Sequence, residues 1–477
     1  MMSAVLSNPD HPEYGVATIP FPVPHDQYAY CMKLLEALEI GDAVKADCKV
    51  DKIDSFYTVL KRTEMLTVNV EELNYLAKRL DSFDTGEAAQ FQAMAHKLEL
   101  FELKDLINLT FCCQQATVIT DFSDLAAVGR NHYMNLHGGS ASVEELNALD
   151  GKKTARQLIE SGSGTITPYG VVYDNGMKLE QVYGGRFFPC YYYEPNAITV
   201  AVTSKAEPED TNHITWLFLP MVQEEIDRAL LRGGITDPAD VRLRLEDSQF
   251  PNEVDVLLDM EYETLSDLNE LAEATDGLSK ADMEKLGAVV MLAKPKSAAQ
   301  IKNLAESLDL FDLAPGAHTP QEYGKYMIQQ SGRFEYDENL DAFYDYEKYG
   351  TERMNEEDGM FTDRGYIAYK GYISIGATNY SQKTIYILEA SATLHEFGHF
   401  LDWQLGFPAE HEQLYLAEAQ NSGLRDYAKT NAREYFADSF DYWITHGSNS
   451  EMMEHLRKNA PQTWTCFETL EKNNWSG

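Results

Sequence analysis

The sequence lacks the features that would place the protein in a membrane or outside the cell. None of its 477 residues belongs to an apolar run long enough to be a membrane span, which takes roughly 18 apolar residues or more. The N-terminus has no basic region followed by an apolar core, so we expect no secretory signal. The six cysteines have no zinc-finger spacing, and Cys112 and Cys113 are adjacent. Buried thiols in a reducing compartment fit this pattern, and we expect a cytoplasmic protein.

Basic residues are also scarce. The chain has 39 Lys and Arg residues against 77 Asp and Glu residues, a formal net charge of −38. Such a charge argues against direct binding to nucleic acid or to an anionic membrane, because both would repel it. The hydrophobic content of 44% and the aromatic content of 11% argue for a folded chain. The length predicts two to four domains.

One motif carries a specific chemistry. Residues 391–402 read SATLHEFGHFLD and fit an amphipathic helix. His395 and His399 would lie on one helix face, where both imidazoles can hold one Zn²⁺. Glu396 lies one residue further round, where it can act as a base on a zinc-bound water. The alternative is an accidental match on a helix that only packs against other helices.

A third zinc ligand is expected from a second helix. Residues 427–438 read YAKTNAREYFAD and have helical periodicity. Glu434 would complete a set of three protein ligands and leave the fourth position open for water, as in catalytic zinc sites. The alternative is a capping box, in which Asn431 caps the helix and Glu434 is its partner.

Two further carboxylates are candidates for supporting the ligands. Asp402 lies three residues after His399, and Asp438 lies four residues after Glu434, so each lies on the helix face of a ligand. A carboxylate that accepts the second N–H of a ligand histidine fixes its tautomer and raises its basicity. Solvated helix carboxylates are the alternative for both.

These residues together resemble the anthrax lethal factor-like zinc metallopeptidases. The shared pattern is the HEFGH motif followed by Tyr427, Glu434 and the segment Tyr435–Asp438. The segments 371–376 and 384–388 are similar to an edge strand and the next strand of that family. The resemblance covers residues 369–477 and implies a gluzincin-type endopeptidase. It also implies that His395, His399 and Glu434 hold Zn²⁺, that Glu396 is the general base and that Tyr427 stabilises the oxyanion.

The remainder of the chain contains an internal repeat. Glu72–Ala77 (ELNYLA) aligns with Asp267–Ala272 (DLNELA) at an offset of 195 residues. The same offset pairs Asn108 with Asn303, Leu109 with Leu304, and Gly129 with Gly324. Solenoid repeats have much shorter periods, of roughly 20–50 residues. The offset therefore predicts duplicated domains.

The second copy resembles ArdA-type antirestriction proteins, which are encoded on conjugative elements and phages. The resemblance covers residues 213–368 and rests on the segments 267–272, 308–316, 322–326, 343–350 and 361–367. It implies an acidic, dimeric mimic of DNA that binds type I restriction–modification enzymes. Residues 205–365 carry 36 acidic and 15 basic side chains, a net charge of −21. A solvated, solubilising face is the alternative for this charge. The first copy, residues 15–175, lacks the Tyr-Asp-Tyr-Glu block of the second.

The predicted fold class is α+β, with several domains. Residues 1–205 and 206–368 are expected to form two mixed α/β ArdA-like copies, the second one acidic. Residues 369–477 are expected to form a mainly helical, zincin-like metallopeptidase domain. Strands are predicted within the first copy at residues 169–173, 186–193 and 198–202.

Two functions of different class fit these predictions. In the first, a zinc endopeptidase uses its acidic region to recruit a protein substrate, such as a DNA-binding restriction or regulatory protein, in counter-defence by a mobile genetic element. In the second, the chain is a DNA-mimic antirestriction protein whose zinc domain is structural or non-catalytic. Both imply a protein partner, with no direct contact to nucleic acid or membrane and no bound organic cofactor. A homodimer is compatible with either function.

Overall fold

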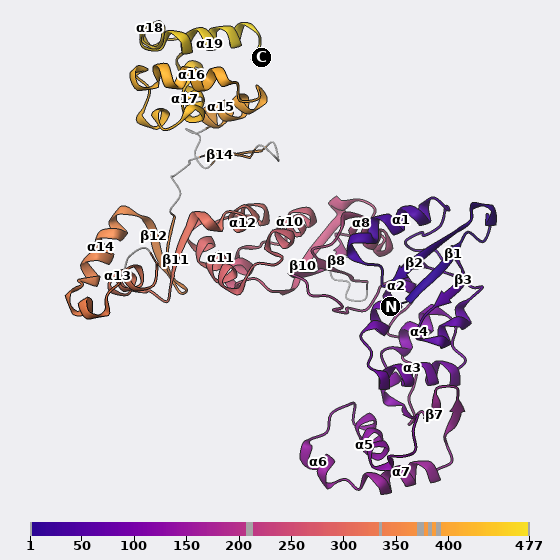
Figure 1. Cartoon of the computed structure of the whole chain (residues 1–477). Helices are drawn as coiled ribbons and strands as arrows, with labels where there is room; N and C mark the ends of the chain where they lie inside the picture. The colour runs from indigo at the N-terminus through magenta and orange to yellow at the C-terminus, as the bar shows by residue number, and fades with distance from the viewer. Residues whose placement is uncertain are drawn as a thin grey trace. The chain divides into compact units, whose positions relative to one another are not determined.

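The chain folds into two compact units, Met1–Tyr369 and Lys370–Gly477 (Figure 1). The computed structural model describes residues 2–206, 213–332, 336–369, 376–379, 384–387 and 393–475. The expected copies 1–205 and 206–368 both lie in the first unit. Within the described ranges, no helix is long and apolar enough to cross a membrane.

The first unit opens with an antiparallel sheet of strand order β2-β1-β3-β4. Along β1 and β2 the side chains of Ala4, Leu6, Ile19 and Phe21 are buried, in the period-two pattern of a sheet with one covered face. The strands are β1 (Met2–Ser7), β2 (Val16–Phe21), β3 (Cys48–Asp54) and β4 (Thr67–Val68). The helices that follow the first strands are α1 (Tyr28–Glu36), α2 (Val70–Asp81), α3 (Thr85–Lys97) and α4 (Leu103–Leu109).

A smaller sheet of strand order β5-β7-β6 completes this half of the unit. Its strands are β5 (Thr117–Ile119), β6 (Thr165–Thr167) and β7 (Gly170–Tyr173). The helices between them are α5 (Leu125–Leu136), α6 (Val143–Ala148) and α7 (Gly151–Glu160). Strand β7 matches the strand predicted at residues 169–173.

The second half of the unit again contains two three-stranded sheets, of order β10-β8-β9 and β11-β13-β12. The strands are β8 (Ile198–Ser204), β9 (Thr215–Leu219), β10 (Val241–Ser248), β11 (Phe311–Pro315), β12 (Asp358–Thr362) and β13 (Gly365–Tyr369). The helices are α8 (Gln223–Gly233), α9 (Asn252–Leu257), α10 (Leu265–Thr275), α11 (Lys280–Ala293), α12 (Ala298–Ala305), α13 (Pro320–Gln329) and α14 (Tyr346–Glu356).

The two halves share strand order and individual hydrogen bonds. Strands β2-β1-β3 correspond to β9-β8-β10, and β5-β7-β6 to β11-β13-β12. In the first half, the buried side chain of Asn74 on α2 accepts a hydrogen bond from the backbone N–H of Val23 at 2.8 Å. In the second half, Asn269 on α10 accepts one from Met221, also at 2.8 Å. The two asparagines are 195 residues apart, the offset of the sequence repeat.

The close helix pairs of the two halves also correspond. A Cβ atom on Gly129 of α5 would lie 1.8 Å from the carbonyl oxygen of Gly151 on α7. A Cβ atom on Gly350 of α14 would lie 1.9 Å from the carbonyl oxygen of Pro320 on α13. Only glycine permits backbones to approach this closely. The equivalent helix pairs α5–α7 and α13–α14 therefore both depend on a glycine at the point of closest contact.

The strand predicted at residues 186–193 is wrong, because this aromatic segment is irregular backbone that packs against α2. The ring of Phe188 stacks on Tyr75 of α2 with 4.5 Å between ring centroids. Three residues earlier on α2, Glu72 accepts a hydrogen bond at 2.7 Å from the hydroxyl of the fully buried Tyr183, which comes just before this segment. Phe188 and Tyr191 of the segment are thus half-buried against α2, and the segment has no sheet pairing.

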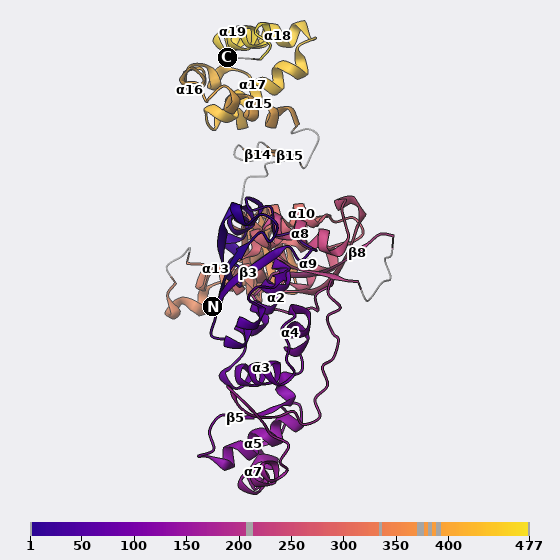
Figure 2. The same cartoon turned by 90° about the vertical axis from the view of Figure 1, so that its right-hand side faces the viewer.

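The second unit is mainly helical, as Figure 2 shows for its labelled elements. Its α-helices are α15 (Thr393–Gln404), α16 (Ala409–Glu418), α17 (Ala432–His446), α18 (Ser450–Asn459) and α19 (Pro461–Lys472). Two short strands, β14 (Gly376–Asn379) and β15 (Thr384–Ile387), pair antiparallel. Strand β15 lies where a strand was expected at 384–388. The other expected strand, 371–376, lies outside the described residues except for Gly376.

The core of this unit lies between α17 and α19. Phe436 and Trp443 of α17 pack on the fully buried ring of Phe467 of α19, with centroid distances of 4.9 and 6.0 Å. The buried carboxylate of Glu418 accepts hydrogen bonds from the backbone N–H of Gln462 and Thr463, each at 2.8 Å. It thereby satisfies the free N–H groups at the start of α19. These contacts fix the position of α17, which carries half of the candidate site.

Candidate metal centre

The site lies where α15 crosses α17. A Cβ atom on Gly398 of α15 would lie 2.7 Å from Cα of Ala437 on α17. No other residue at position 398 would allow the two backbones to come so close. The glycine of the HEFGH motif therefore brings the histidines of α15 within reach of the first turn of α17.

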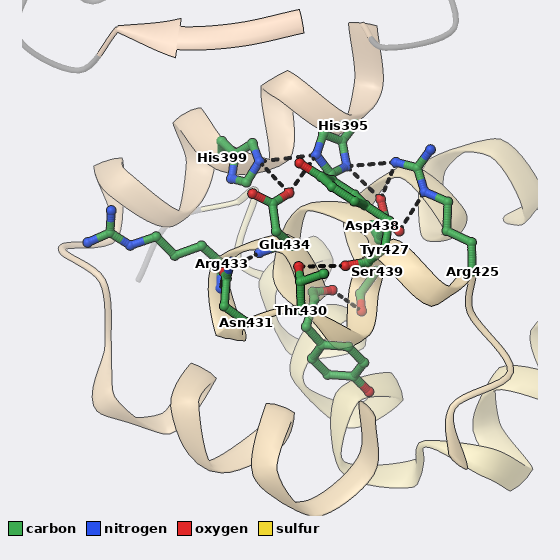
Figure 3. Close-up of polar contacts among 11 residues, drawn as sticks. His395, His399, Arg425, Tyr427, Thr430, Asn431, Arg433, Glu434, Asp438 and Ser439 are labelled. Atoms are coloured by element: carbon green, nitrogen blue, oxygen red, sulfur yellow. Dashed lines mark hydrogen bonds and ion pairs between the residues drawn. The ribbon is translucent and has the colours of Figure 1, made fainter. Parts of the chain in front are cut away.

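Three side chains converge at this crossing. Nε2 of His395 lies 3.1 Å from Nε2 of His399 and 3.0 Å from Oε2 of Glu434. Nε2 of His399 lies 3.2 Å from the same Oε2 atom (Figure 3). Among the described residues these three form the one group of His, Cys, Asp or Glu with the spacing of metal ligands. The predicted triad is thus brought together from two helices.

The spacing of the three donor atoms fits a small tetrahedral cation. Zinc bonds of about 2.0–2.1 Å at tetrahedral angles separate neighbouring ligand atoms by about 3.3 Å. The observed separations of 3.0, 3.1 and 3.2 Å are close to that value. Two imidazoles and one carboxylate are also the donor set of many catalytic zinc sites. The residues present therefore fit zinc.

The capping-box alternative is correct in that Asn431 caps the helix, but the side chain of Glu434 is not its capping partner. Asn431 is the N-cap of α17, and its side chain accepts from the backbone N–H of Arg433 at 3.0 Å and of Glu434 at 3.1 Å. The carboxylate of Glu434 points to the two histidines. The cap therefore fixes the first turn of α17, and the Glu434 side chain is left to face the site.

Asp438 supports His395 from the side opposite the donor atoms. Its Oδ1 lies 2.6 Å from Nδ1 of His395, and its side chain is only 3% exposed. A hydrogen bond from Nδ1–H leaves the lone pair of Nε2 free to bind a metal. The same carboxylate is bound by the guanidinium of Arg425. Sequence reasoning had no role for Arg425, which belongs to neither motif.

Asp402 does not support a ligand histidine, and the expectation for it is corrected. Its Oδ1 lies 2.6 Å from Nδ1 of His411 on α16. The ring of His411 in turn stacks on Phe436 with 4.1 Å between centroids. Nδ1 of His399 is buried and has no hydrogen-bond partner among the described residues. Position on the helix face of His399 was not sufficient, because a histidine of the next helix competes for this carboxylate.

The two residues expected to act on a substrate both lie at the centre. Glu396 is buried beside the ligands on α15, with 3% exposure. The ring of Tyr427 lies 5.8 Å from the ring of His395. Burial raises the pKa of Tyr427 to about 12, and the charge of Glu434 and a hydrogen bond to it act in the same direction. Tyr427 therefore stays a hydroxyl donor at neutral pH.

With this geometry defined, the chain can be compared with known families. Residues 345–470 match the family model of the anthrax toxin lethal factor, N- and C-terminal domain. The lethal factor-like region thus contains both helices of the metal centre. Residues 211–368 match the family model of the antirestriction protein ArdA. No curated protein matches the chain.

Both resemblances predicted from the sequence are confirmed by these matches. The lethal factor-like region begins earlier than expected, at residue 345, and overlaps the ArdA-like region up to residue 368. The overlap contains α14, β12 and all but the last residue of β13, and these elements belong to the first compact unit.

The electrostatics of the lethal factor-like centre favour a positive charge between its ligands. Burial alone would lower the pKa of His395, but hydrogen bonds with Asp438 and Glu434 raise it to about 9. Burial alone would raise the pKa of Glu434, but hydrogen bonds with His395 and His399 lower it to about 2. The metal-free site therefore holds a proton at neutral pH in the place where a cation would bind.

Proposed function

We propose that the second unit is a zinc-dependent endopeptidase. The observation that carries the proposal is the triangle of donor atoms from His395, His399 and Glu434, with sides of 3.0–3.2 Å. A zinc ion that only stabilises a fold is usually held by four protein ligands, whereas a catalytic one keeps a position open. Three ligands with a buried glutamate and a tyrosine hydroxyl beside them favour catalysis.

Each group in the proposed site has a different role in amide hydrolysis. Zinc held by His395, His399 and Glu434 would polarise the substrate carbonyl and would lower the pKa of an attacking water to about 7. Glu396 accepts the proton of that water as its oxygen bonds to the carbonyl carbon, and it then delivers the proton to the leaving amine when the C–N bond breaks. Tyr427 donates a hydrogen bond to the oxygen that becomes negatively charged.

The acidic region is proposed to bind the protein that is cleaved. It has the match to ArdA, and its charge of −21 over residues 205–365 suits a partner with a basic, DNA-binding groove. Part of this acidic surface is held in place by its own aromatic residues. Asp341 accepts hydrogen bonds from Gln329 at 2.8 Å and from the hydroxyls of Tyr336 and Tyr346 at 2.7 and 2.6 Å. A restriction or regulatory protein would have the required groove.

The first half of the unit is proposed to be the first, divergent copy of the ArdA-like fold. The shared strand order and the equivalent hydrogen bonds of Asn74 and Asn269 support this. The copies differ in charge around their last helix. Residues 336–358 carry nine acidic and two basic side chains, whereas residues 142–164 carry four and three. Binding of a basic partner is therefore assigned to the second copy.

The acidity of the ArdA-like region also favours a second function, a DNA-mimic antirestriction protein with a structural zinc domain. The two functions separate in cells that express the full chain. Loss of restriction activity that persists when Glu396 is replaced by Gln would favour the binding function alone. Cleavage of a host protein that depends on Glu396 would favour the peptidase.

The direct test compares new protein N-termini in cells expressing the wild type and Glu396→Gln. We expect a small set of cleavages with the wild type only, in proteins that bind nucleic acid. Glu412→Gln, an exposed carboxylate on α16, is the control and should cleave like the wild type. Identical N-termini with and without Glu396 would rule out the peptidase.

The role of the acidic region can be tested in the same cells. Glu338, Glu347 and Glu352 of the second copy are exposed, and their joint replacement by Gln should reduce cleavage of the recruited protein. The matched control replaces three exposed glutamates of the first half, Glu102, Glu144 and Glu160. Equal cleavage by both variants would contradict recruitment through the second copy.

A further inference from the structure

Arg425 lies between α16 and α17 and binds the carboxylate of Asp438 with two hydrogen bonds. Its Nε lies 2.7 Å from Oδ2, and its Nη2 lies 2.5 Å from Oδ1. The planar guanidinium matches both oxygens of a carboxylate at once, which a lysine cannot do. In Figure 3 the guanidinium and the imidazole of His395 meet at the same carboxylate.

Asp438 needs such a partner because of its depth. Its side chain is 3% exposed, and a buried carboxylate is costly unless it is paired and hydrogen-bonded. One oxygen, Oδ1, serves both Nδ1 of His395 at 2.6 Å and Nη2 of Arg425. The second oxygen is held by Nε of Arg425. The guanidinium thus sets the rotation of the carboxylate that orients His395.

Arg425 also borders the other side of the site. Its guanidinium carbon lies 5.5 Å from the centre of the Tyr427 ring, two residues along the chain. Its own side chain is 52% exposed, so the guanidinium lies between the buried Asp438 and solvent. One arginine therefore contacts both the support of a ligand and the residue expected to stabilise the oxyanion.

We propose that Arg425 is a positioning residue of the metal centre. It holds Asp438 in the orientation that directs Nε2 of His395 at the metal. Its Nη2 also lies 3.2 Å from Nδ1 of His395, but Nδ1 gives its hydrogen to Asp438, so Arg425 acts through that carboxylate without touching substrate or metal. This inference rests on the proposed zinc site. Only one of the two ligand histidines is supported in this way, because Nδ1 of His399 has no hydrogen-bond partner among the described residues. Loss of Arg425 therefore disturbs one ligand of the three.

The test measures zinc affinity, by competition with a chromophoric chelator, for the full-length protein and its variants. Replacement of a group that supports a ligand histidine weakens metal binding by about 10- to 100-fold. We expect a loss in this range for Arg425→Gln and a smaller one for Arg425→Lys, which keeps the charge but not the paired hydrogen bonds. The control is Arg457→Gln, an exposed arginine of α18 that should leave the affinity unchanged.

Two further readouts separate positioning from a merely structural role. The absorption bands of the Co²⁺-substituted protein report ligand geometry, and they should shift in Arg425→Gln but not in Arg457→Gln. With a peptide substrate, kcat should fall while KM changes little, because Arg425 does not contact the substrate. If Arg425→Gln does not fold, Arg425→Lys is measured by the same two readouts.

A double-mutant cycle completes the design. If Arg425 acts through Asp438, then Asp438→Asn and the double variant should bind zinc with the same affinity. Additive losses, or a wild-type affinity and Co²⁺ spectrum in both Arg425 variants, would overturn the inference. Wild-type protein that binds no zinc would instead overturn the proposed function, and the inference with it.

Discussion

Gly398 and Ala437 form the contact on which the candidate metal centre is built. A Cβ atom on Gly398 would lie 2.7 Å from Cα and 2.9 Å from the carbonyl oxygen of Ala437. The contact lies one residue before His399 and three residues after Glu434, so the distance between the helices sets the distance between the ligands. A glycine inside a helix costs stability, and here its reason is the approach of a second helix.

Replacing Gly398 by Val should separate the ligands. The added atoms cannot fit beside Ala437, so α15 and α17 must move apart, at a cost of about 1–3 kcal/mol in folding free energy. Zinc affinity should fall more than 10-fold, because Glu434 no longer reaches both histidines. Chelator competition and thermal unfolding measure the two effects. Gly184→Ala is the control, since its methyl group would meet no atom within 4 Å.

Zinc binding should release a proton at neutral pH. The pKa of His395 is raised to about 9 in the metal-free protein, so zinc must displace that proton. The affinity should therefore rise with pH from about 7 to 9 and level off above it. Because this pKa lies above the ordinary value of 6.5, the metal-free protein gains stability from it below pH 6.5 and loses it as the pH rises through 9. Calorimetry in buffers of different ionisation enthalpy counts the protons, and a count of zero at pH 7 would contradict the assignment.

Removing the hydroxyl of Tyr427 should affect chemistry more than metal binding. Loss of one donor to a developing oxyanion reduces kcat by about 100- to 1000-fold. Tyr427→Phe should therefore keep its zinc, while its peptide cleavage falls within that range. The control is Tyr415→Phe, which removes a hydroxyl bound to the backbone oxygen of Lys429. A Tyr427→Phe enzyme with full kcat would exclude the oxyanion role.

The two asparagines of the internal repeat should contribute equally to the folding stability of the protein. Asn74 and Asn269 each satisfy a backbone N–H while 5% and 8% exposed. Replacing either one by Ala should destabilise its half of the unit by about 1–3 kcal/mol, because it leaves a buried donor without a partner. Urea unfolding measures both. Asn131→Ala and Asn355→Ala, at exposed positions, should change little. A large effect from only one of the buried pair would count against duplicated folds.

The helical part of the site was predictable, because its residues follow short-range rules. The i, i+4 spacing of His395 and His399 fixes their shared face, and a third ligand on another helix was expected from zinc chemistry. Asp402 was predicted wrongly by the same rule, since its partner His411 comes from the next helix. Arg425 could not be found at all. It lies 13 residues before Asp438, outside the helix that carries this carboxylate, and no helical spacing predicts that contact.

The fold of the first unit was predictable where the repeat could be aligned. The helices at Glu72–Ala77 and Asp267–Ala272 are both present, in α2 and α10. The segment 186–193 was mistaken for a strand because its aromatic residues suit a pleated surface. Its side chains instead pack on α2. This contact is between residues far apart in the sequence, so local sequence does not predict it.

The central claim is that zinc held by this triad hydrolyses peptide bonds with Glu396 as the base, and one measurement tests it most directly. Purified wild type and Glu396→Gln are matched for bound zinc by elemental analysis and then incubated with a peptide library. We predict one zinc per chain in both proteins, with cleavage by the wild type and a loss of at least about 100-fold in the variant. Equal cleavage by the two proteins, or a wild type that binds no zinc, would contradict the account.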